Sequence, residues 1–289
     1  MASTQLLKSR VRSVKSTRQI TKAMQLVAAS KMRRAQEATK VSEPYTAAAR
    51  SLLAALSSHN SVKNHPLFVQ RPVKNRLLIV IASDKGLAGA YNSNVVKVYL
   101  NELKADDAAG IKNKTITIGR KASQFAARIK DTEIVGAYEE LPDRPDGNDI
   151  RAVLESARTL FTAGEVDAVD VIYTDFISSI TQVAKVQRVL PAGSGQSDLP
   201  ASSREVSYEP STEEVLDGVT YRLVTAQIFQ ALLDARASEH SMRMMAMKNA
   251  SDNASDLIDD LTLEMNKARQ GAITQELAEI SGGVEALNE

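Results

Sequence analysis

RSVKSTRQITKAMQLVAASKMRRAQ, residues 12–36, contains neither glycine nor proline and repeats its apolar or small side chains every three or four positions. The repeat continues on both sides of this stretch, and its members are Leu7, Val11, Val14, Thr17, Thr21, Met24, Ala28, Met32, Ala35 and Ala38. A mean spacing of about 3.5 residues is typical of the seam of a coiled coil. The sequence therefore predicts a long N-terminal helix that pairs with another helix.

The C-terminal end of the chain has the same texture. No proline follows Pro210, no glycine lies between Val219 and Gln270, and strong helix formers dominate this part of the chain. A second seam is predicted at Ile228, Leu232, Ala235, Met242, Ala246, Ala250, Asn253, Leu257, Leu261, Met265, Ala268 and Ala272. A polar residue in a seam, such as Asn253, weakens packing but fixes the register.

We interpret the two seams as one long antiparallel coiled coil, because the helices lie at opposite ends of the chain with a globular insert between them. Helices of about 55 and 65 residues would span roughly 80 and 100 Å at about 1.5 Å per residue. The first helix is expected to bend or end near Pro44, since the proline ring removes a backbone donor.

The middle of the chain alternates between two patterns. Short runs rich in β-branched residues predict strands at 76–83, 115–118, 168–176 and 181–190, and helical patterns occupy 94–103, 121–129 and 150–161. This alternation predicts an inserted, Rossmann-like α/β domain with a mostly parallel sheet. The predicted organisation is a coiled-coil helix over 1–60, the α/β domain over 75–200 and a second coiled-coil helix over 208–289.

Composition limits the classes of protein to which the chain can belong. With 43% hydrophobic and 25% charged residues the chain is not of the disordered class, and it has no cysteine for disulfides, thiolate chemistry or soft-metal sites. No stretch approaches the roughly 20 apolar residues of a membrane span, so membrane association is expected to be peripheral. Residues 1–40 carry ten Lys or Arg and one acid, whereas 205–289 carry sixteen acids and six bases. Ends of opposite charge attract each other or differently charged partners.

The segment SDKGLAGAYNSN, residues 83–94, follows the first predicted strand and leads into a helix. Phosphates often bind at this position of α/β folds, so a nucleotide site is one alternative. The spacing matches neither GxGxxG nor the Walker pattern. We favour a tight strand-to-helix turn that uses Gly86 and Gly89 for its backbone geometry.

No residue pattern predicts an active site or a metal site. The three histidines are far apart in sequence, no nucleophile stands in an elbow motif, and no carboxylate pair has a recognisable acid and base arrangement. The basic first helix leaves nucleic-acid binding as an alternative, but residues 1–40 contain no aromatic residue. We therefore expect a non-catalytic protein without cofactors that does not bind nucleic acid.

Three separated motifs resemble the gamma-subunit family of F-type ATP synthases: residues 12–36, residues 83–94, and SEHSMRMMAMKNASDNASDLIDDLTLEMNKARQGAITQELAEISGG at 238–283. The resemblance covers effectively the whole chain. It implies a central-stalk rotor that turns inside a ring of alternating alpha and beta subunits, with the α/β domain as a foot on the membrane rotor ring, the c-ring, and with the epsilon subunit as a further partner. The rotor itself would catalyse nothing.

The resemblance also implies contact residues. Arg269, Gln270, Thr274 and Glu276 match positions that touch loops of the catalytic subunits, and Met24 and Arg243 match positions where the two helices cross. Four basic positions are expected to face an acidic loop of the same subunits: Lys31, Arg33, Arg34 and Lys85. Tyr208 and Glu209 are candidates for contact with partners of the foot.

The expected location is the cytoplasmic face of a bacterial plasma membrane, reached through the other subunits. This expectation rests on the similarity to bacterial versions and on the first ten residues, MASTQLLKSR, which lack the apolar run of a secretory signal. The matrix side of the mitochondrial inner membrane is the alternative.

Overall fold

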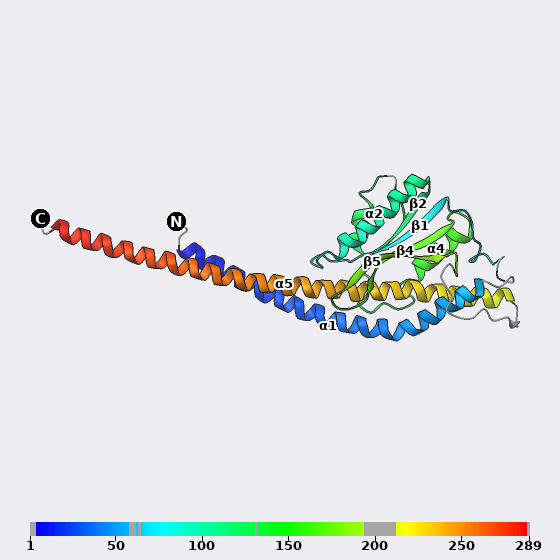
Figure 1. Cartoon of the computed structure of the whole chain (residues 1–289), viewed down its shortest axis with the longest axis horizontal. Coiled ribbons are helices and arrows are strands. Elements are labelled where there is room, and N and C mark those ends of the chain that lie inside the picture. The colour runs from blue at the N-terminus through cyan, green and yellow to red at the C-terminus, as the bar shows by residue number, and fades with distance from the viewer. Residues whose placement is uncertain (1–3, 58–61, 63–64, 131, 194–211, 288–289) are drawn as a thin grey trace. The chain divides into compact units, whose positions relative to one another are not determined.

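The computed structural model describes residues 4–57, 62, 65–130, 132–193 and 212–287. The chain divides into two compact units. We call residues 1–28 with 244–289 the coiled-coil unit, and residues 29–243 the α/β unit. Two long helices belong to both: α1 is Thr4–Ser57, 54 residues, and α5 is Thr212–Leu287, 76 residues (Figure 1). The prediction of two unusually long terminal helices is confirmed.

Helix α1 does not end at Pro44. It continues through the proline to Ser57, and its ribbon changes direction in this second half (Figure 1). Proline leaves one carbonyl of the preceding turn without its donor, and a bent helix tolerates this loss. Of the two expectations for Pro44, the bend is correct and the end of the helix is wrong.

In the coiled-coil unit, the helices pack through a small apolar cluster. Leu7 and Val11 of α1 are buried against Ile258 and Leu261 of α5, and Met265 packs at the edge of this cluster. Farther along, Arg18 Nη1 donates a hydrogen bond to Ser255 Oγ at 3.4 Å. As the residue number increases along α1, the number of the contacting residue in α5 decreases. The two helices are therefore antiparallel, as predicted.

The predicted seam of α5 is wrong by one position over part of its length. Met247, Ser251, Ala254 and Ile258 are buried, whereas Asn253 and Leu257 are exposed. Both sets of positions offer small or apolar side chains at helical spacing, so periodicity alone could not separate them. Asn253 faces solvent and does not set the register of the seam.

The α/β unit contains a five-stranded sheet with the order β3-β2-β1-β4-β5. Its strands are β1 Asn75–Ile81, β2 Lys112–Ile118, β3 Glu133–Tyr138, β4 Ala168–Phe176 and β5 Gln182–Leu190. Neighbouring strands run parallel, except that β5 is antiparallel to β4. Strand β3 was not predicted from the sequence. It lies at the edge of the sheet without a fully buried residue, so it lacks the continuous apolar run that marks β1.

Helices cover both faces of this sheet: α2 Tyr91–Ala109, α3 Arg120–Ala126 and α4 Arg151–Thr162. On one face, Leu78 and Val80 of β1 pack against Val95 and Tyr99 of α2, with α3 beside them. The opposite face packs against α4 and the adjoining parts of α1 and α5, through Val153, Leu154, Leu53, Leu223, Ile228 and Leu232. Figure 1 shows α2 and α4 on opposite sides of the strands. The base of α5 is therefore part of the domain core.

No helix within the described ranges is both long enough and apolar enough to cross a lipid bilayer.

Candidate functional site

The part of α5 from Ala231 to Ser241 is buried on all sides. Most helices of a soluble protein bury one stripe and leave the opposite face in water. This segment nevertheless carries four ionisable side chains, Asp234, Arg236, Glu239 and His240, all at most 9% exposed. Charged groups in such surroundings require partners, because burying an unpaired charge is costly.

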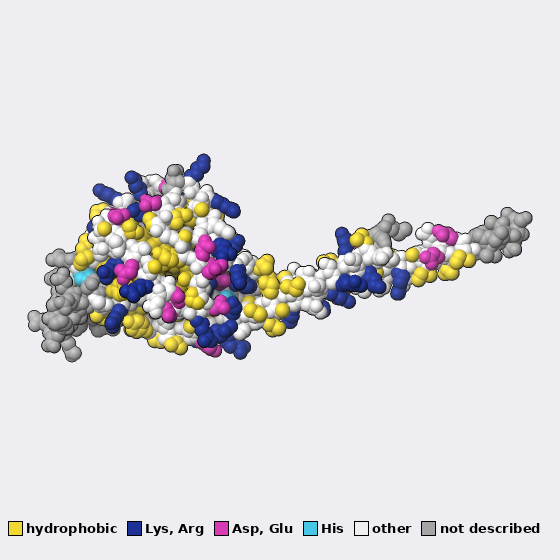
Figure 2. Space-filling view, turned by 180° about the vertical axis from the view of Figure 1, so that it is seen from behind, with side chains coloured by type: hydrophobic (Ala, Val, Ile, Leu, Met, Phe, Trp, Pro, Cys, Tyr) yellow, Lys and Arg dark blue, Asp and Glu magenta, His cyan; other side chains and the backbone are white. Residues whose placement is uncertain are grey.

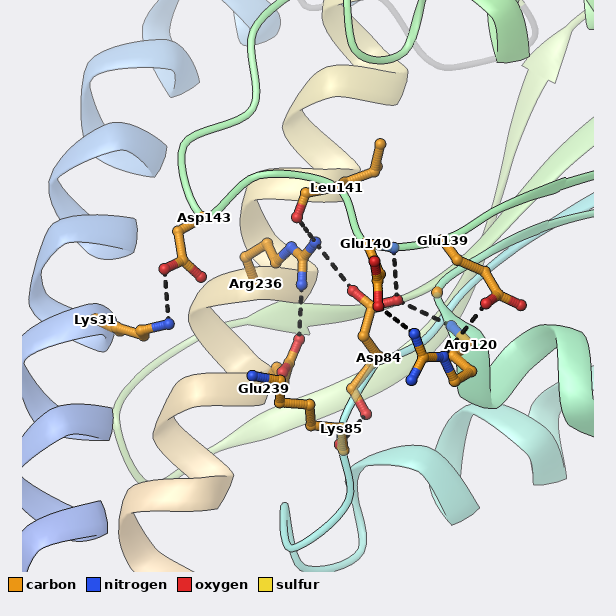
Figure 3. A network of polar contacts seen from close by, with 12 residues as sticks. Lys31, Asp84, Lys85, Arg120, Glu139, Glu140, Leu141, Asp143, Arg236 and Glu239 are labelled. Atoms are coloured by element: carbon orange, nitrogen blue, oxygen red, sulfur yellow. Dashed lines mark hydrogen bonds and ion pairs between the residues drawn. The ribbon is translucent and has the colours of Figure 1, made fainter.

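Arg236 has partners in loops at the carboxyl end of the parallel strands, whereas Glu239 is paired with arginines of α5 itself (Figure 3). Arg236 Nη2 donates to the Leu141 carbonyl at 3.0 Å and lies 3.6 Å from Asp84 Oδ2. Arg236 Nη1 donates to Glu239 Oε2 at 3.3 Å. The other oxygen of Glu239 accepts a bond of 2.7 Å from Arg243 Nη1. One carboxylate therefore joins two arginines that lie one turn before it and one turn after it in α5.

Arg243 also holds the loop that follows β1. Its Nη2 donates to the carbonyl oxygens of Lys85 and Gly86 at 2.9 and 3.3 Å. Arg243 is a predicted contact position for the catalytic subunits, and so is Lys85. The structure brings these two residues together, and the guanidinium of Arg243 is engaged within this chain.

The loop after β1 has an unusual backbone. Leu87 and Gly89 have φ angles of 61° and 56°, in the left-handed region, whereas Gly86 does not lie there. The prediction that glycine supplies the turn geometry is confirmed for Gly89 and wrong for Gly86. Leu87 adopts a strained conformation for a residue with a side chain and is 64% exposed.

The same loop offers poor surroundings for a phosphate. Asp84 Oδ1 accepts the backbone N–H groups of Arg120 and Glu140, both at 3.0 Å. The Ser83 N–H donates to Asn92 Oδ1 at 3.1 Å. Phosphate sites at such turns use free N–H groups and positive charge, whereas here a carboxylate occupies the tip of the strand. The geometry favours the structural interpretation of residues 83–94 over a nucleotide site.

Lys31 and Arg34 line a groove of about 480 Å³ between α1, residues 143–145 and α5. Lys31 Nζ pairs with Asp143 Oδ2 at 2.6 Å, and this contact lowers the pKa of the Asp143 carboxyl (Figure 3). Apolar side chains make up much of the lining: Ala35, Ala38, Val41, Pro145, Phe229 and Leu233. The groove therefore combines an apolar lining with four basic side chains, Arg144 and Arg236 among them, and two acidic ones, Glu37 and Asp143.

The other predicted contact positions differ in exposure. Arg33 faces solvent on α1 of the α/β unit, and Met24 is half-buried in the coiled-coil unit. In α5 of the coiled-coil unit, Arg269, Gln270, Thr274 and Glu276 are all exposed. Thr274 Oγ1 donates to the Gln270 carbonyl at 2.9 Å, one turn earlier. Tyr208 and Glu209 lie outside the described residues.

Basic residues cover the α1 side of the coiled-coil unit, whereas its α5 side exposes the acids Asp252, Asp256, Asp259, Asp260 and Glu264. The part of α1 in this unit has six Lys and Arg residues, and all are exposed: Lys8, Arg10, Arg12, Lys15, Arg18 and Lys22. Figure 2 shows dark-blue side chains along this unit. Surface charges of one sign attract partners of the opposite sign over several ångströms.

Burial changes the proton affinity of two groups in α5. For Asp234, burial raises the pKa to about 7, and the nearby Asp175 and Glu43 add to the rise, while Gln230 and Lys185 oppose it. For His240, burial lowers the pKa to about 4; Arg243, Arg236 and Lys31 act in the same direction, and Glu239 opposes them. The folded chain therefore holds Asp234 partly protonated and His240 neutral near pH 7.

Asp234 and His240 make the free energy of unfolding depend on pH in opposite directions. Between about pH 4 and pH 7, Asp234 binds more protons in the folded chain than in the unfolded chain, so its contribution is lost as pH rises towards 7. Neutral His240 contributes stability that is lost as pH falls from about 6.5 to 4.

Replacing Asp234 by asparagine is expected to remove the pH dependence of stability that comes from this carboxyl group. The stability of the variant relative to the wild type should increase with pH between pH 5 and 7, by up to about 1.4 kcal/mol per pH unit, because His240 contributes equally to both proteins. Urea unfolding at several pH values measures the difference. Asp256→Asn, at an exposed position of α5, is the control and should show no such trend. If the difference in free energy of unfolding between Asp234→Asn and the wild type stayed constant from about pH 5 to 7, this would contradict a raised pKa of Asp234.

Sequence reasoning missed Asp84, Arg236 and Glu239. Arg236 and Glu239 stand in a helix that reads as one side of a coiled coil, where charged residues normally face water. The available signal was the position of Arg236 and Glu239 beside the seam residues Leu232 and Ala235, with Asp84 directly after a buried strand. Only the packing of α5 on the strand ends turns this into a buried network.

A family model described as ATP synthase matches residues 3–287 of the chain. Among curated relatives, the ATP synthase gamma chain of Stenotrophomonas maltophilia is 40% identical over 288 residues, which cover 99% of this chain and all of that protein. The ATP synthase gamma chain of Staphylococcus epidermidis is 39% identical, with the same coverage of each chain.

Solved structures give the same result. A chain of the mitochondrial ATP synthase central stalk and c-ring of Tetrahymena thermophila is 28% identical, with a TM-score of 0.65, covering 80% of this chain and 99% of that one. A chain of the Euglena gracilis mitochondrial ATP synthase shares the fold, with 18% identity, a TM-score of 0.70, and coverage of 98% and 94%. Two long antiparallel helices flanking a mostly parallel α/β sheet, together with similarity to gamma chains over nearly every residue, show that this chain belongs to the gamma-chain family of F-type ATP synthases.

Proposed function

We propose that this chain is the central-stalk rotor of an F-type ATP synthase. In this role it couples proton-driven rotation of the membrane rotor ring to conformational changes in the catalytic subunits, and it does no bond-making chemistry itself. The observation that carries the proposal is that similarity to gamma chains extends over residues 3–287, including both continuous helices of 54 and 76 residues.

The proposed partners are the hexameric ring of alpha and beta subunits, the epsilon subunit and the c-ring. The Tetrahymena relative belongs to an assembly of central stalk and c-ring, which supports the last of these. A rotor works by presenting different surfaces to the same partner at different angles. Each catalytic subunit then meets a different binding free energy as the rotor turns, and its nucleotide affinity shifts accordingly.

Two surfaces of the chain are proposed to contact the catalytic subunits. The first is the exposed set on α5 formed by Arg269, Gln270, Thr274 and Glu276. The second is the basic side of α1 and the loop after β1, with Lys31, Arg33, Arg34 and Lys85, next to the groove described above. An acidic segment of a partner with an apolar residue suits this groove. Electrostatic complementarity of this kind mainly raises association rates and fixes orientation. Met24, Arg243, Tyr208 and Glu209 remain predicted contact residues.

We place the complex on a membrane, with this chain attached peripherally through its partners. The bacterial gamma chains among the relatives support the cytoplasmic face of a bacterial plasma membrane as the location. The matrix side of the mitochondrial inner membrane is the alternative, since relatives of the same fold come from mitochondrial enzymes.

Reversing the two exposed charges in Arg33→Glu/Arg34→Glu is expected to slow assembly with the alpha and beta subunits on the order of tenfold at low salt, because the attraction to an acidic partner is lost. The matched control is Arg128→Glu/Lys130→Glu, which reverses two exposed charges elsewhere on the α/β unit. Association rates measured at low and high ionic strength test both variants. Equal slowing by the two variants, or slowing that does not depend on salt, would argue against this surface as the contact.

A further inference from the structure

One short segment of α5 is bonded to three separate loops at the carboxyl end of the sheet. Arg236 donates to Leu141 after β3, and Arg243 donates to Lys85 after β1, as described above. Ser238 Oγ donates to the Thr174 carbonyl in β4 at 3.1 Å. Ser241 Oγ donates to the carbonyl of Ser179, between β4 and β5, at 2.7 Å. At about 3.6 residues per turn, Arg236 and Arg243 lie on one side of the helix and Ser238 and Ser241 on the roughly opposite side, so α5 is bonded on two sides.

The bonds differ in kind from the rest of the interface. Farther towards the start of α5, the helix meets the sheet through apolar side chains such as Leu223, Ile228 and Leu232. Apolar contact is strong but non-directional, so it resists separation more than it resists rotation about the helix axis. Hydrogen bonds lose strength steeply when their angle changes. The hydrogen bonds on two sides of α5 therefore oppose rotation of the helix about its axis.

Glu239 links the two arginines of this segment. Its side chain is 5% exposed, and its two oxygens contact Arg236 and Arg243 separately. Without the carboxylate, both guanidinium groups would lose their shared counterion. Buried Arg236 would keep the Leu141 carbonyl and Asp84 at 3.6 Å, and half-buried Arg243 would keep the carbonyl oxygens of the loop after β1.

We propose that Glu239, Arg236 and Arg243 form a torsional lock that fixes α5 to the α/β domain, so that torque passes between them without slip. This inference rests on the proposed rotor function. The three are positioning residues: they hold α5 against Asp84, Lys85, Gly86 and Leu141, and they touch no substrate. Through the carbonyl of Lys85 the lock also fixes the loop that presents Lys85 and the left-handed Leu87.

The test uses the complete ATP synthase in closed vesicles, with Glu239→Gln in this chain. The substitution keeps the size of the side chain and removes the shared charge. We expect protons pumped per ATP hydrolysed to fall at least about threefold, and to fall further as the opposing proton gradient grows, because directional bonds that oppose slip are weakened. ATP hydrolysis itself should continue. A merely structural role would reduce the amount of assembled complex but leave this ratio unchanged in the assembled fraction.

The matched control is Glu165→Gln, which removes an exposed carboxylate paired with Lys114 in the same domain. Its pumping ratio should equal that of the wild type. Hydrogen exchange provides an independent measurement on the assembled complex. Amides of residues 84–90 and 139–143 should exchange roughly 100-fold faster in Glu239→Gln, and those of β1 should not change.

Arg243→Lys is a milder second variant, which keeps the charge next to Glu239 but loses the forked contacts to Lys85 and Gly86. It should give an intermediate pumping ratio. An unchanged ratio in both lock variants, with faster exchange in the loops, would overturn the lock. An equal fall in Glu165→Gln would overturn it as well. If the wild-type complex does not pump protons at all with this chain in place, the rotor function fails and the lock fails with it.

Discussion

Replacing Arg76 by methionine is expected to lower the free energy of unfolding of the α/β unit by about 3–5 kcal/mol, because the substitution leaves buried Asp106 without its counterion and buried Asp170 with Arg188 alone. Arg76 is the second residue of β1, lies on the α2 face of the sheet and is 7% exposed. Its Nε donates to Asp170 of β4, and its Nη1 donates to both oxygens of Asp106 in α2 at 3.1 Å. Arg188 of β5 donates to the same Asp170. One guanidinium thus connects two strands and a helix.

Urea or thermal unfolding of the full chain measures this loss. Lys114→Met is the control, because Lys114 makes a more exposed ion pair with Glu165 at 2.7 Å, and such pairs contribute at most about 1 kcal/mol. Asp106→Asn in the Arg76→Met background should recover part of the stability, since Arg76 is the cation that pairs with Asp106, whereas Asp170 keeps Arg188. A loss no greater than that of Lys114→Met would show that Arg76 is not the counterion on which the sheet depends.

Gly119→Ala is expected to destabilise the chain by about 2–5 kcal/mol, from backbone strain and overpacking together. Gly119 follows β2 with a φ of +93°, where residues with a side chain are strained. An added Cβ would stand 2.2 Å from the Ala82 carbonyl oxygen, which belongs to the backbone and cannot rotate away. The Gly119 N–H also donates to the Tyr138 carbonyl at 2.7 Å, so the position cannot shift without loss.

Two other glycines separate the two causes. Gly110 has a φ of +72° with no atom within 4 Å of an added Cβ, so Gly110→Ala should lose about 1–2 kcal/mol from strain alone. Gly86 has neither a left-handed φ nor a close neighbour, so Gly86→Ala should be near neutral. The unfolding midpoint should therefore be highest for Gly86→Ala, lower for Gly110→Ala and lowest for Gly119→Ala. A different order would contradict the clash as the main cause.

The sequence predicted the elements whose signal is local. Strand β1 is an uninterrupted apolar run, and β4 was predicted with the bounds that the structure has, Ala168–Phe176. Strand β3 was missed because an edge strand buries few side chains. The α5 seam was displaced at Asn253 and Leu257, since small side chains on adjacent faces fit either register.

Some residues of the candidate site were predicted from the sequence, and others were missed. Arg33 and Arg269 were predicted as contact residues from the family resemblance; both are exposed, and their role stays a prediction. Arg76, Asp84 and Glu239 could not be predicted from the sequence. Their partners are distant in sequence, as in the pairing of Arg76 with Asp170, and a charged residue in a helix or strand is normally solvated.

The sequence by itself determined that two very long helices pair at the ends of this chain and that an α/β domain lies between them, because helix propensity, seam spacing and strand composition are properties of neighbouring residues. The tertiary structure alone decided which charges are buried and what joins α5 to the strand ends. Whether Arg236 and Arg243 face water or the loops at the strand ends depends on residues 95 and 158 positions away, and the position of those loops is set by the packing of the whole sheet.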